Sequence, residues 1–154
     1  MLRCYPPSAL RTSPIEFKGS ELTSRSSRSF LPRRVLIVED ELLVGLMVEE
    51  MCREAGCRAV RVAHTSSMAR AELAKGDCDA VLLDLSMGNA NNPQIADRLL
   101  AKGIPFAFVT GYDYLVEPRH EKVPMLLKPF TAGQLGDLLT TLGRQTKQQI
   151  NLTG

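Results

Sequence analysis

The sequence predicts an α/β fold, a doubly wound sheet of five parallel strands that alternate with helices. Two observations point to this class. Five short apolar runs recur along the chain, and segments with apolar residues at helical spacing separate them. The runs are apolar at nearly every position, which is typical of parallel strands because helices cover both faces of their sheet.

The expected strands are short and rich in branched apolar side chains. They span residues 35–38, 59–63, 80–84, 106–109 and 125–127. The first expected helix, 41–55, has apolar residues at helical spacing, namely Leu42, Leu43, Leu46, Met47 and Met51. Gly56 follows it as a stop.

The remaining helices are predicted from their ends. Thr65, Ser66 or Ser67 caps a helix that runs through Lys75. The polar loop 86–92 leads into a third helix, 93–102, which has Pro93 in its first turn and is stopped by Gly103. The segment 112–123 contains proline and predicts only a short or irregular helix. Thr131 and Gln134 form a capping box for the last helix, which we expect to end near Gly143.

Length and composition suit one domain. The chain has 154 residues, of which 44% are hydrophobic, and no apolar run approaches the roughly 20 residues of a membrane span. Residues 1–34 hold seven lysines and arginines against two acids, whereas the rest of the chain is mildly acidic. Because the basic charge lies outside the expected domain, we predict neither a nucleic-acid nor a membrane partner.

Three segments follow from this distribution. Residues 1–32 are basic and rich in Ser, Arg and Pro, and we expect a disordered N-terminal extension. A start nearer Leu31 or an organelle-targeting peptide are the alternatives, and Glu16 and Glu21 argue against the second. The domain itself covers 33–145, and 146–154 is predicted to be a short C-terminal tail, too short for an output domain.

The cysteines and histidines predict no metal or redox centre. No pair among Cys4, Cys52, Cys57 and Cys78 has the CxxC spacing. We therefore expect free thiols and a reducing, cytoplasmic location. His64 and His120 are too few and too far apart in sequence for a zinc site.

Charged residues follow the expected strands at the ends where ligands bind in open α/β sheets. Glu39 and Asp40 follow the first strand, Asp84 ends the third, and Lys128 follows the fifth. Three carboxylates with one counter-cation suit Mg²⁺ and a phosphoryl group. Asp40 and Asp84 are expected to bind the ion directly, Glu39 directly or through water, and the backbone carbonyl of Ser86 is a further candidate ligand.

The same residues suggest a chemistry. A carboxylate such as Asp84 can attack phosphorus and form an acyl phosphate. Positioning and charge neutralisation supply most of the catalysis of phosphoryl transfer. Lys128 is expected to contact one phosphate oxygen, and the hydroxyl of Thr110 is expected to contact another.

The motifs that carry these residues resemble the receiver domain of two-component response regulators, over about 33–145. They are Val35-Leu36-Ile37-Val38-Glu39-Asp40-Glu41, Val81-Leu82-Leu83-Asp84-Leu85, Val109-Thr110 and Leu127-Lys128-Pro129-Phe130. The resemblance implies a CheY-like, flavodoxin-like sheet of strand order 2-1-3-4-5. It also implies that Asp84 is the phosphoacceptor, Glu39 and Asp40 the acidic metal pair, Thr110 the switch hydroxyl and Lys128 the phosphate-contacting lysine. A cis Lys128–Pro129 peptide is implied as well.

One position departs from the usual receiver pattern. Receivers usually carry an aromatic residue three positions before the lysine, and this chain has Met125 there. The segment from Pro105 to Tyr112 resembles the atypical FAT GUY receivers, although Val109 stands where that motif has alanine. Those receivers often stand alone and are associated with sensor kinases of alphaproteobacteria. The resemblance therefore implies a different readout, in which Tyr112 and the short fourth helix are candidates.

The expected function is that of a single-domain bacterial response regulator, a phosphoacceptor and not an enzyme. Its partner would be a sensor histidine kinase or a phosphotransfer protein. The downstream partner, a phosphate-sink role and a homodimer stay open. An Asp-nucleophile phosphatase is an alternative, but it needs an acid two residues after its nucleophile, where this chain has Ser86 after Asp84 and Leu42 after Asp40. A phosphorylation-independent pseudo-receiver is the other alternative.

Overall fold

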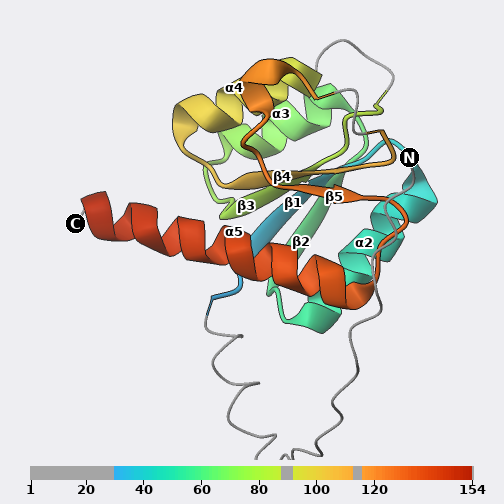
Figure 1. Ribbon diagram of the computed structural model, residues 1–154, viewed down its shortest axis with the longest axis horizontal. Helices are drawn as coiled ribbons and strands as arrows, with labels where there is room; N and C mark the ends of the chain where they lie inside the picture. The colour runs from blue at the N-terminus through green and yellow to red at the C-terminus, as the bar shows by residue number, and fades with distance from the viewer. Residues whose placement is uncertain (1–29, 88–91, 113–115, 154) are drawn as a thin grey trace, which may run out of the picture.

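The computed structural model describes residues 30–87, 92–112 and 116–153. Its elements alternate along the chain as predicted (Figure 1). They are β1 (Arg34–Val38), α2 (Leu42–Ala55), β2 (Ala59–Ala63), α3 (Ser66–Ala74), β3 (Ala80–Leu83), α4 (Asn92–Lys102), β4 (Phe106–Thr110), η2 (Pro118–His120, a 3₁₀ turn), β5 (Met125–Leu127) and α5 (Ala132–Thr153).

The five strands form one parallel sheet in the order β2-β1-β3-β4-β5, which confirms the predicted class and strand order. Helices α3 and α4 cover one face of the sheet, and α2 and α5 cover the other (Figure 1). Each face has its own core. Val35 and Ile37 of β1 belong to the core under α2 and α5, whereas Leu36 and Val38 belong to the core under α3 and α4. The strand is apolar from Val35 to Val38 because both of its faces are buried there.

The helix ends are stabilised largely as the sequence predicts. Gly56 ends α2 in the left-handed region at φ 115°, a conformation that favours glycine. The hydroxyl of Thr65 caps α3 by accepting from the Met68 amide at 3.1 Å. At the start of α5, the Gln134 amide donates to the Thr131 hydroxyl, and the Thr131 amide donates to the Gln134 side chain. This reciprocal pair is the predicted capping box.

The last helix is longer than predicted. α5 continues to Thr153, so its expected end near Gly143 is wrong, and the segment expected as a C-terminal tail is helical up to Thr153. Gly143 is a packing residue: a Cβ built there would lie 1.4 Å from the Phe30 carbonyl oxygen. The absence of a side chain lets the backbone of Phe30 and Leu31 cross the helix at close range.

The packed domain also begins earlier than residue 33. The side chain of Leu31 packs against the core under α2 and α5, and Pro32 is buried. Residues 1–29 lie outside the described residues, so the disorder expected for them stays a prediction. In the segment after β4, the short 3₁₀ turn η2 confirms the expectation of an irregular fourth helix, with 113–115 outside the description.

The cysteines of the described part are free thiols, as expected, at Cys52, Cys57 and Cys78. Burial raises the pKa of Cys52 to about 12, which makes this thiol inert at neutral pH. None of the described helices has both the length and the apolar character needed to cross a membrane.

Candidate functional site

The register of the sheet brings the predicted acids together. The Glu39 amide donates to the Ala63 carbonyl at 3.0 Å, and the Asp84 amide donates to the Val38 carbonyl at 3.0 Å. The ladder hydrogen bonds therefore continue one residue past β1 and β3. They fix the backbones of Glu39 and Asp84 beside each other at the carboxyl edge of the sheet.

Lys128 lies between the two buried carboxylates. Its Nζ is 2.5 Å from Oε2 of Glu39 and 3.1 Å from Oδ2 of Asp84. The Lys128 amide donates to the Thr110 carbonyl at 2.9 Å, which ties this backbone to the end of β4. The Lys128–Pro129 peptide is cis, as the resemblance implied.

Ser86 holds the carboxylate of Asp84 in place. Its amide donates to Oδ1 at 2.9 Å and its hydroxyl donates to Oδ2 at 2.7 Å. Burial acts to raise the pKa of Asp84, but these bonds and the Lys128 ammonium outweigh it and lower the pKa below its ordinary value. The carboxylate is thus held ionised, the form that can act as a nucleophile or bind a metal.

In contrast to Asp84, both Glu39 and Lys128 have a pKa that is raised in the folded protein. Burial raises the pKa of Glu39 above its ordinary value, although Lys128 and the Glu41 amide stabilise the charged form. Burial acts to lower the pKa of Lys128, but Glu39 and Asp84 outweigh it and raise that pKa. Lys128 therefore stays a cation throughout the neutral range.

The carboxylates of Glu39, Asp40 and Asp84 could hold a metal ion. One oxygen from each lies within 4.8 Å of the others. Glu39 and Asp84 are buried and Asp40 is exposed, so the group opens to solvent on one side. Three carboxyl groups lie beside one ammonium, and an all-oxygen donor set suits Mg²⁺. The side chains present fit the predicted ion.

Thr110 and Met125 belong to β4 and β5, and Tyr112 follows the end of β4 by two residues. Thr110 ends β4 and is buried, and its hydroxyl accepts from the Tyr112 amide at 3.2 Å. Tyr112 is about half exposed. Met125 opens β5, opposite Phe108, and is 40% exposed. The Met125 side chain is a thioether and has no hydroxyl. It therefore cannot donate a hydrogen bond to Thr110.

Two contacts were missed by the sequence reasoning. Ser86 was predicted to contribute its carbonyl, and the structure adds its amide and hydroxyl as donors to Asp84. His64 was dismissed as a zinc ligand, yet its Nδ1 lies 2.9 Å from the Glu39 carbonyl. The carbonyl only accepts, so this bond requires the proton on Nδ1. The register of β1 and β2 could have revealed it, because Val38 pairs with Ala63 and the next residues then lie side by side.

The chain is similar to known proteins over most of its described part. A family model described as the response regulator receiver domain matches residues 35–140. The transcriptional regulatory protein PdtaR of Mycobacterium tuberculosis is 36% identical over 112 residues, which cover 68% of this chain and 54% of PdtaR. The chain thus spans about half the length of the curated relatives it matches.

Solved structures share the fold. SdrG from Sphingomonas melonis is 36% identical with a TM-score of 0.62, covering 71% of this chain and 94% of SdrG. A CheY-like receiver domain from Methylobacillus flagellatus is 21% identical with a TM-score of 0.64, covering 71% of this chain and 98% of that one, and supports the fold alone. The match of the family model over more than half of the chain establishes that this protein belongs to the response regulator receiver domain family.

Proposed function

We propose that this chain acts as a single-domain response regulator that accepts a phosphoryl group on Asp84 from a histidine kinase or a phosphotransfer protein. The observation that carries the proposal is the buried Asp84 carboxylate, oriented by Ser86 and paired with Lys128 at 3.1 Å. This chain aligns with 94% of SdrG, a protein that has also been solved in a BeF₃-activated conformation. That coverage supports the single-domain role.

In the proposed reaction, an oxygen of Asp84 bonds to phosphorus while the bond from phosphorus to the donor histidine nitrogen breaks. The product is an acyl phosphate, and the histidine ring takes up one proton from solvent and leaves as a neutral imidazole. Lys128 then contacts a phosphoryl oxygen, and the Thr110 hydroxyl contacts another. Bound Mg²⁺, held by Glu39, Asp40, Asp84 and the Ser86 carbonyl, would neutralise charge on the transferred group.

A hydrophobic surface beside the site supports docking of the phosphodonor. The first two turns of α2, directly after Glu39 and Asp40, expose large apolar side chains at Leu42, Leu43, Leu46 and Met47. Leu43 is 80% exposed. A donor that brings its histidine to Asp84 must cover this edge of the sheet, and covering these side chains would stabilise the complex.

The proposed readout differs from that of receivers with an aromatic residue at the position of Met125. Tyr112 is joined to Thr110 by the hydrogen bond of its amide, so a shift of the Thr110 hydroxyl toward a phosphoryl group would break that bond. Movement of Tyr112 and of the following η2 turn would then carry the signal to a protein partner. A phosphate-sink role needs no such movement.

Incubation with a phosphorylated donor and Mg²⁺ tests the proposal, with the acyl phosphate measured by phosphate-affinity electrophoresis and mass spectrometry. Wild type and the control Asp137→Asn, an exposed residue of α5, are expected to be labelled, and Asp84→Asn is not. Labelling that persists in Asp84→Asn would remove Asp84 from this role. Turnover of a small phosphate ester would favour a phosphatase instead.

A further inference from the structure

A second surface lies at the opposite edge of the sheet, where the strands begin. Arg34 opens β1, Asp79 precedes β3 and Pro105 precedes β4. The C-terminal part of α5 projects past this edge (Figure 1). Two hollows, of about 770 and 590 Å³, flank the projecting part and share Arg34, Asp79, Thr146 and Ile150 in their lining. We call these two hollows together the basic groove.

The charge of the basic groove is strongly positive among the described residues. Its lining has one carboxylate, Asp79, and five cations: Arg33, Arg34, Arg58, Lys102 and Lys147. Asp79 pairs with Arg34 at 2.7 Å, and the cations of the lining outnumber its carboxylates. Such a cluster attracts an anionic partner.

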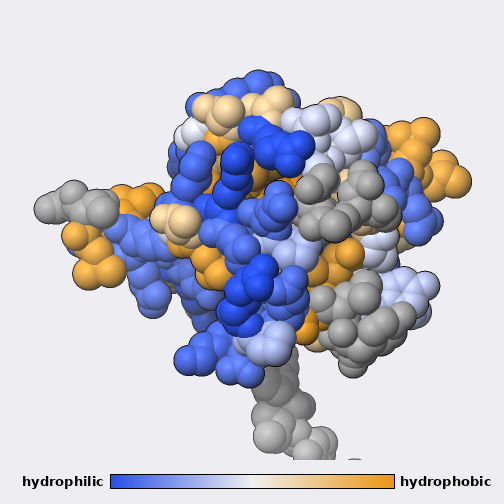
Figure 2. All heavy atoms as spheres, turned by 90° about the horizontal axis from the view of Figure 1, so that it is seen from above, coloured by the Kyte–Doolittle hydropathy of each residue, from blue (hydrophilic) through white to orange (hydrophobic). Residues whose placement is uncertain are grey.

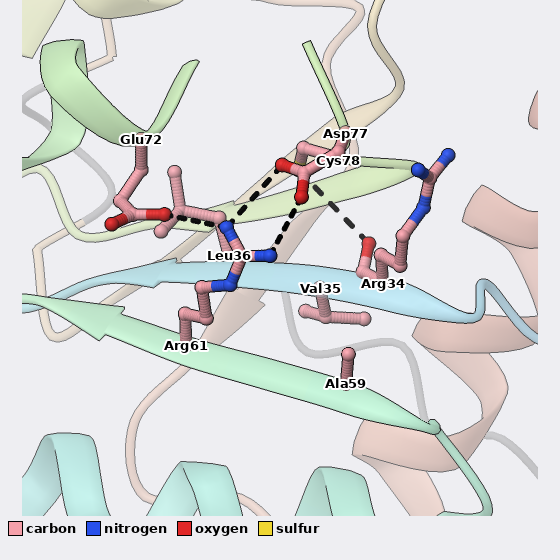
Figure 3. Close-up of a pocket in the computed structure, with 8 residues that line it drawn as sticks. All are labelled: Arg34, Val35, Leu36, Ala59, Arg61, Glu72, Asp77 and Cys78. Carbon is pink, nitrogen blue, oxygen red and sulfur yellow. Dashed lines mark hydrogen bonds and ion pairs between the residues drawn. The ribbon is translucent and has the colours of Figure 1, made fainter. Parts of the chain in front are cut away.

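The neighbouring cluster on the same side of the sheet has balanced charges (Figure 3). There Arg61 of β2 pairs with Glu72 at 2.7 Å and with Asp77 at 2.7 Å. The positive charge of the basic groove is therefore a local property and does not extend over this whole side of the domain.

Apolar side chains accompany the charge. Along the inner side of α5, Leu139 and Leu142 are buried, and one turn later the Thr146 hydroxyl donates to the Asp79 carbonyl at 3.0 Å. Ile150 follows one turn further on the same side of the helix. It is 64% exposed because α5 has passed the edge of the sheet. Leu152, two residues later on a different face of the helix, is 86% exposed and lines the second hollow. Figure 2 shows hydrophobic residues gathered at this projecting end, at the left of the view.

The positive charge of the basic groove limits which kind of partner can bind there. The chain before Phe30 carries five lysines and arginines against two acids, so like charge opposes its binding there. A second copy of this chain would bring its own basic surface against the cations of the groove, and like charges repel. A nucleic acid offers no apolar strip for Ile150, and binding to an anionic membrane surface is an outcome that the test below distinguishes.

We propose that the basic groove binds an acidic amphipathic helix of a partner protein in its larger hollow, with an apolar stripe against Ile150 and carboxylates against Arg33 and Arg58. The groove lies at the opposite edge of the sheet from Asp84. Binding is therefore independent of phosphorylation, and the helix acts as a constitutive tether.

Fluorescence anisotropy with designed peptides tests this proposal. One labelled peptide of about five turns places leucines along one face among glutamates, and a second has the same composition in permuted order. Equal charge makes the permuted peptide the control for non-specific attraction. We expect the amphipathic peptide to bind at least about tenfold more tightly, and to bind Asp84→Asn as it binds wild type.

Surface variants locate the site. The variant Ile150→Ser and the pair Arg33→Glu with Arg58→Glu should each weaken binding about tenfold. Leu43→Ser and Arg98→Glu, exposed changes outside the groove lining, should leave binding unchanged. Circular dichroism checks that each variant is folded.

Four outcomes would overturn the proposal: no binding, equal binding of the two peptides, groove variants that bind like wild type, or tighter binding of a single-stranded DNA oligonucleotide or of phosphatidylserine vesicles than of the amphipathic peptide. Loss of phosphorylation in Asp84→Asn with intact peptide binding separates this inference from the proposed function.

Discussion

Lys128 donates from its ammonium to Oδ2 of Asp84 over 3.1 Å, although 44 residues separate the two in the chain. The strands that precede them are not neighbours, because β4 lies between β3 and β5. The same ammonium also reaches Glu39 at 2.5 Å. One cation thus joins the ends of three strands and compensates two buried carboxylates.

Replacing this cation should destabilise the fold and slow phosphoryl uptake. In Lys128→Met, Glu39 and Asp84 stay buried without their cation, and we expect a loss on the order of 1–3 kcal/mol in the free energy of unfolding at pH 7. Lys75→Met is the matched control, because Lys75 forms an exposed pair with Glu72 at 2.6 Å and should cost less than about 0.5 kcal/mol. Equal losses in the two variants, measured by urea unfolding, would contradict this account.

The effect of Lys128→Met should also depend on pH. The pKa of Asp84 is lowered in the folded protein, so its stabilisation is present above the ordinary pKa of about 4 and is lost as the pH falls through the folded value. Lys128 contributes to this lowering. The difference in stability between wild type and Lys128→Met should therefore shrink when the urea series is repeated below pH 4.

Magnesium should stabilise the protein through the three carboxylates. A ligand that binds only the folded state at 100 times its dissociation constant adds about 2.7 kcal/mol. Asp40 is exposed, so Asp40→Asn should fold normally and lose most of the Mg²⁺-dependent rise in thermal midpoint. Asp137→Asn should keep it. The scans compare MgCl₂ with NaCl at equal ionic strength, and a full Mg²⁺ response in Asp40→Asn would exclude Asp40 as a ligand.

The positions of Glu39, Asp84 and Lys128 could be predicted because they depend only on where the strands end and on how the strands are arranged in the sheet. Each follows an apolar run, and the carboxyl ends of parallel strands meet at one edge. The donation from Ser86 to Asp84 and from His64 to Glu39 could not be predicted, since these depend on side-chain rotamers and strand register. The length of α5 was underestimated because Gly143 was interpreted as a helix stop. Its actual role depends on Phe30, more than a hundred residues away in the chain.

Docking of the phosphodonor should depend on Leu43. We expect Leu43→Ser to lower the rate of transfer from a phosphorylated kinase about tenfold, because an exposed apolar contact is lost. Uptake from acetyl phosphate needs no docking surface and should be unchanged. Leu152→Ser, equally exposed but at the opposite edge, is the matched control. A parallel fall with both donors would place the effect in the chemistry and not in docking.

Two glycines of α5 should respond to alanine with opposite signs. Alanine normally stabilises a helix interior by up to about 1 kcal/mol relative to glycine. Gly136 has nothing within 4 Å of the added Cβ, so Gly136→Ala should be stabilising. Gly143→Ala places its Cβ on the Phe30 carbonyl, and this segment must move. We expect a lower urea midpoint and faster proteolysis near Phe30, and a gain in stability in both variants would show that the crossing does not persist in solution.

His120 should hold the η2 turn in place more strongly than its neighbour Arg119. The buried ring of His120 lies 2.8 Å from the Asp97 carboxylate of α4 through Nε2, and its ring centroid is 6.0 Å from that of Phe108 in β4. Arg119 makes two bonds to the same carboxylate, at 2.9 and 3.1 Å, but both partners are about half exposed.

Burial decides which of these contacts matters for stability. His120→Ala leaves a cavity beside Phe108 and removes a buried hydrogen bond, so a loss on the order of 2–3 kcal/mol is expected. Arg119→Met should cost less than about 0.5 kcal/mol. Hydrogen exchange should become faster over 116–123 in His120→Ala alone, because the turn loses the buried ring that contacts both Asp97 of α4 and Phe108 of β4. A larger effect of Arg119→Met on either measurement would mean that the exposed ion pair, and not the buried ring, holds the segment that follows Tyr112.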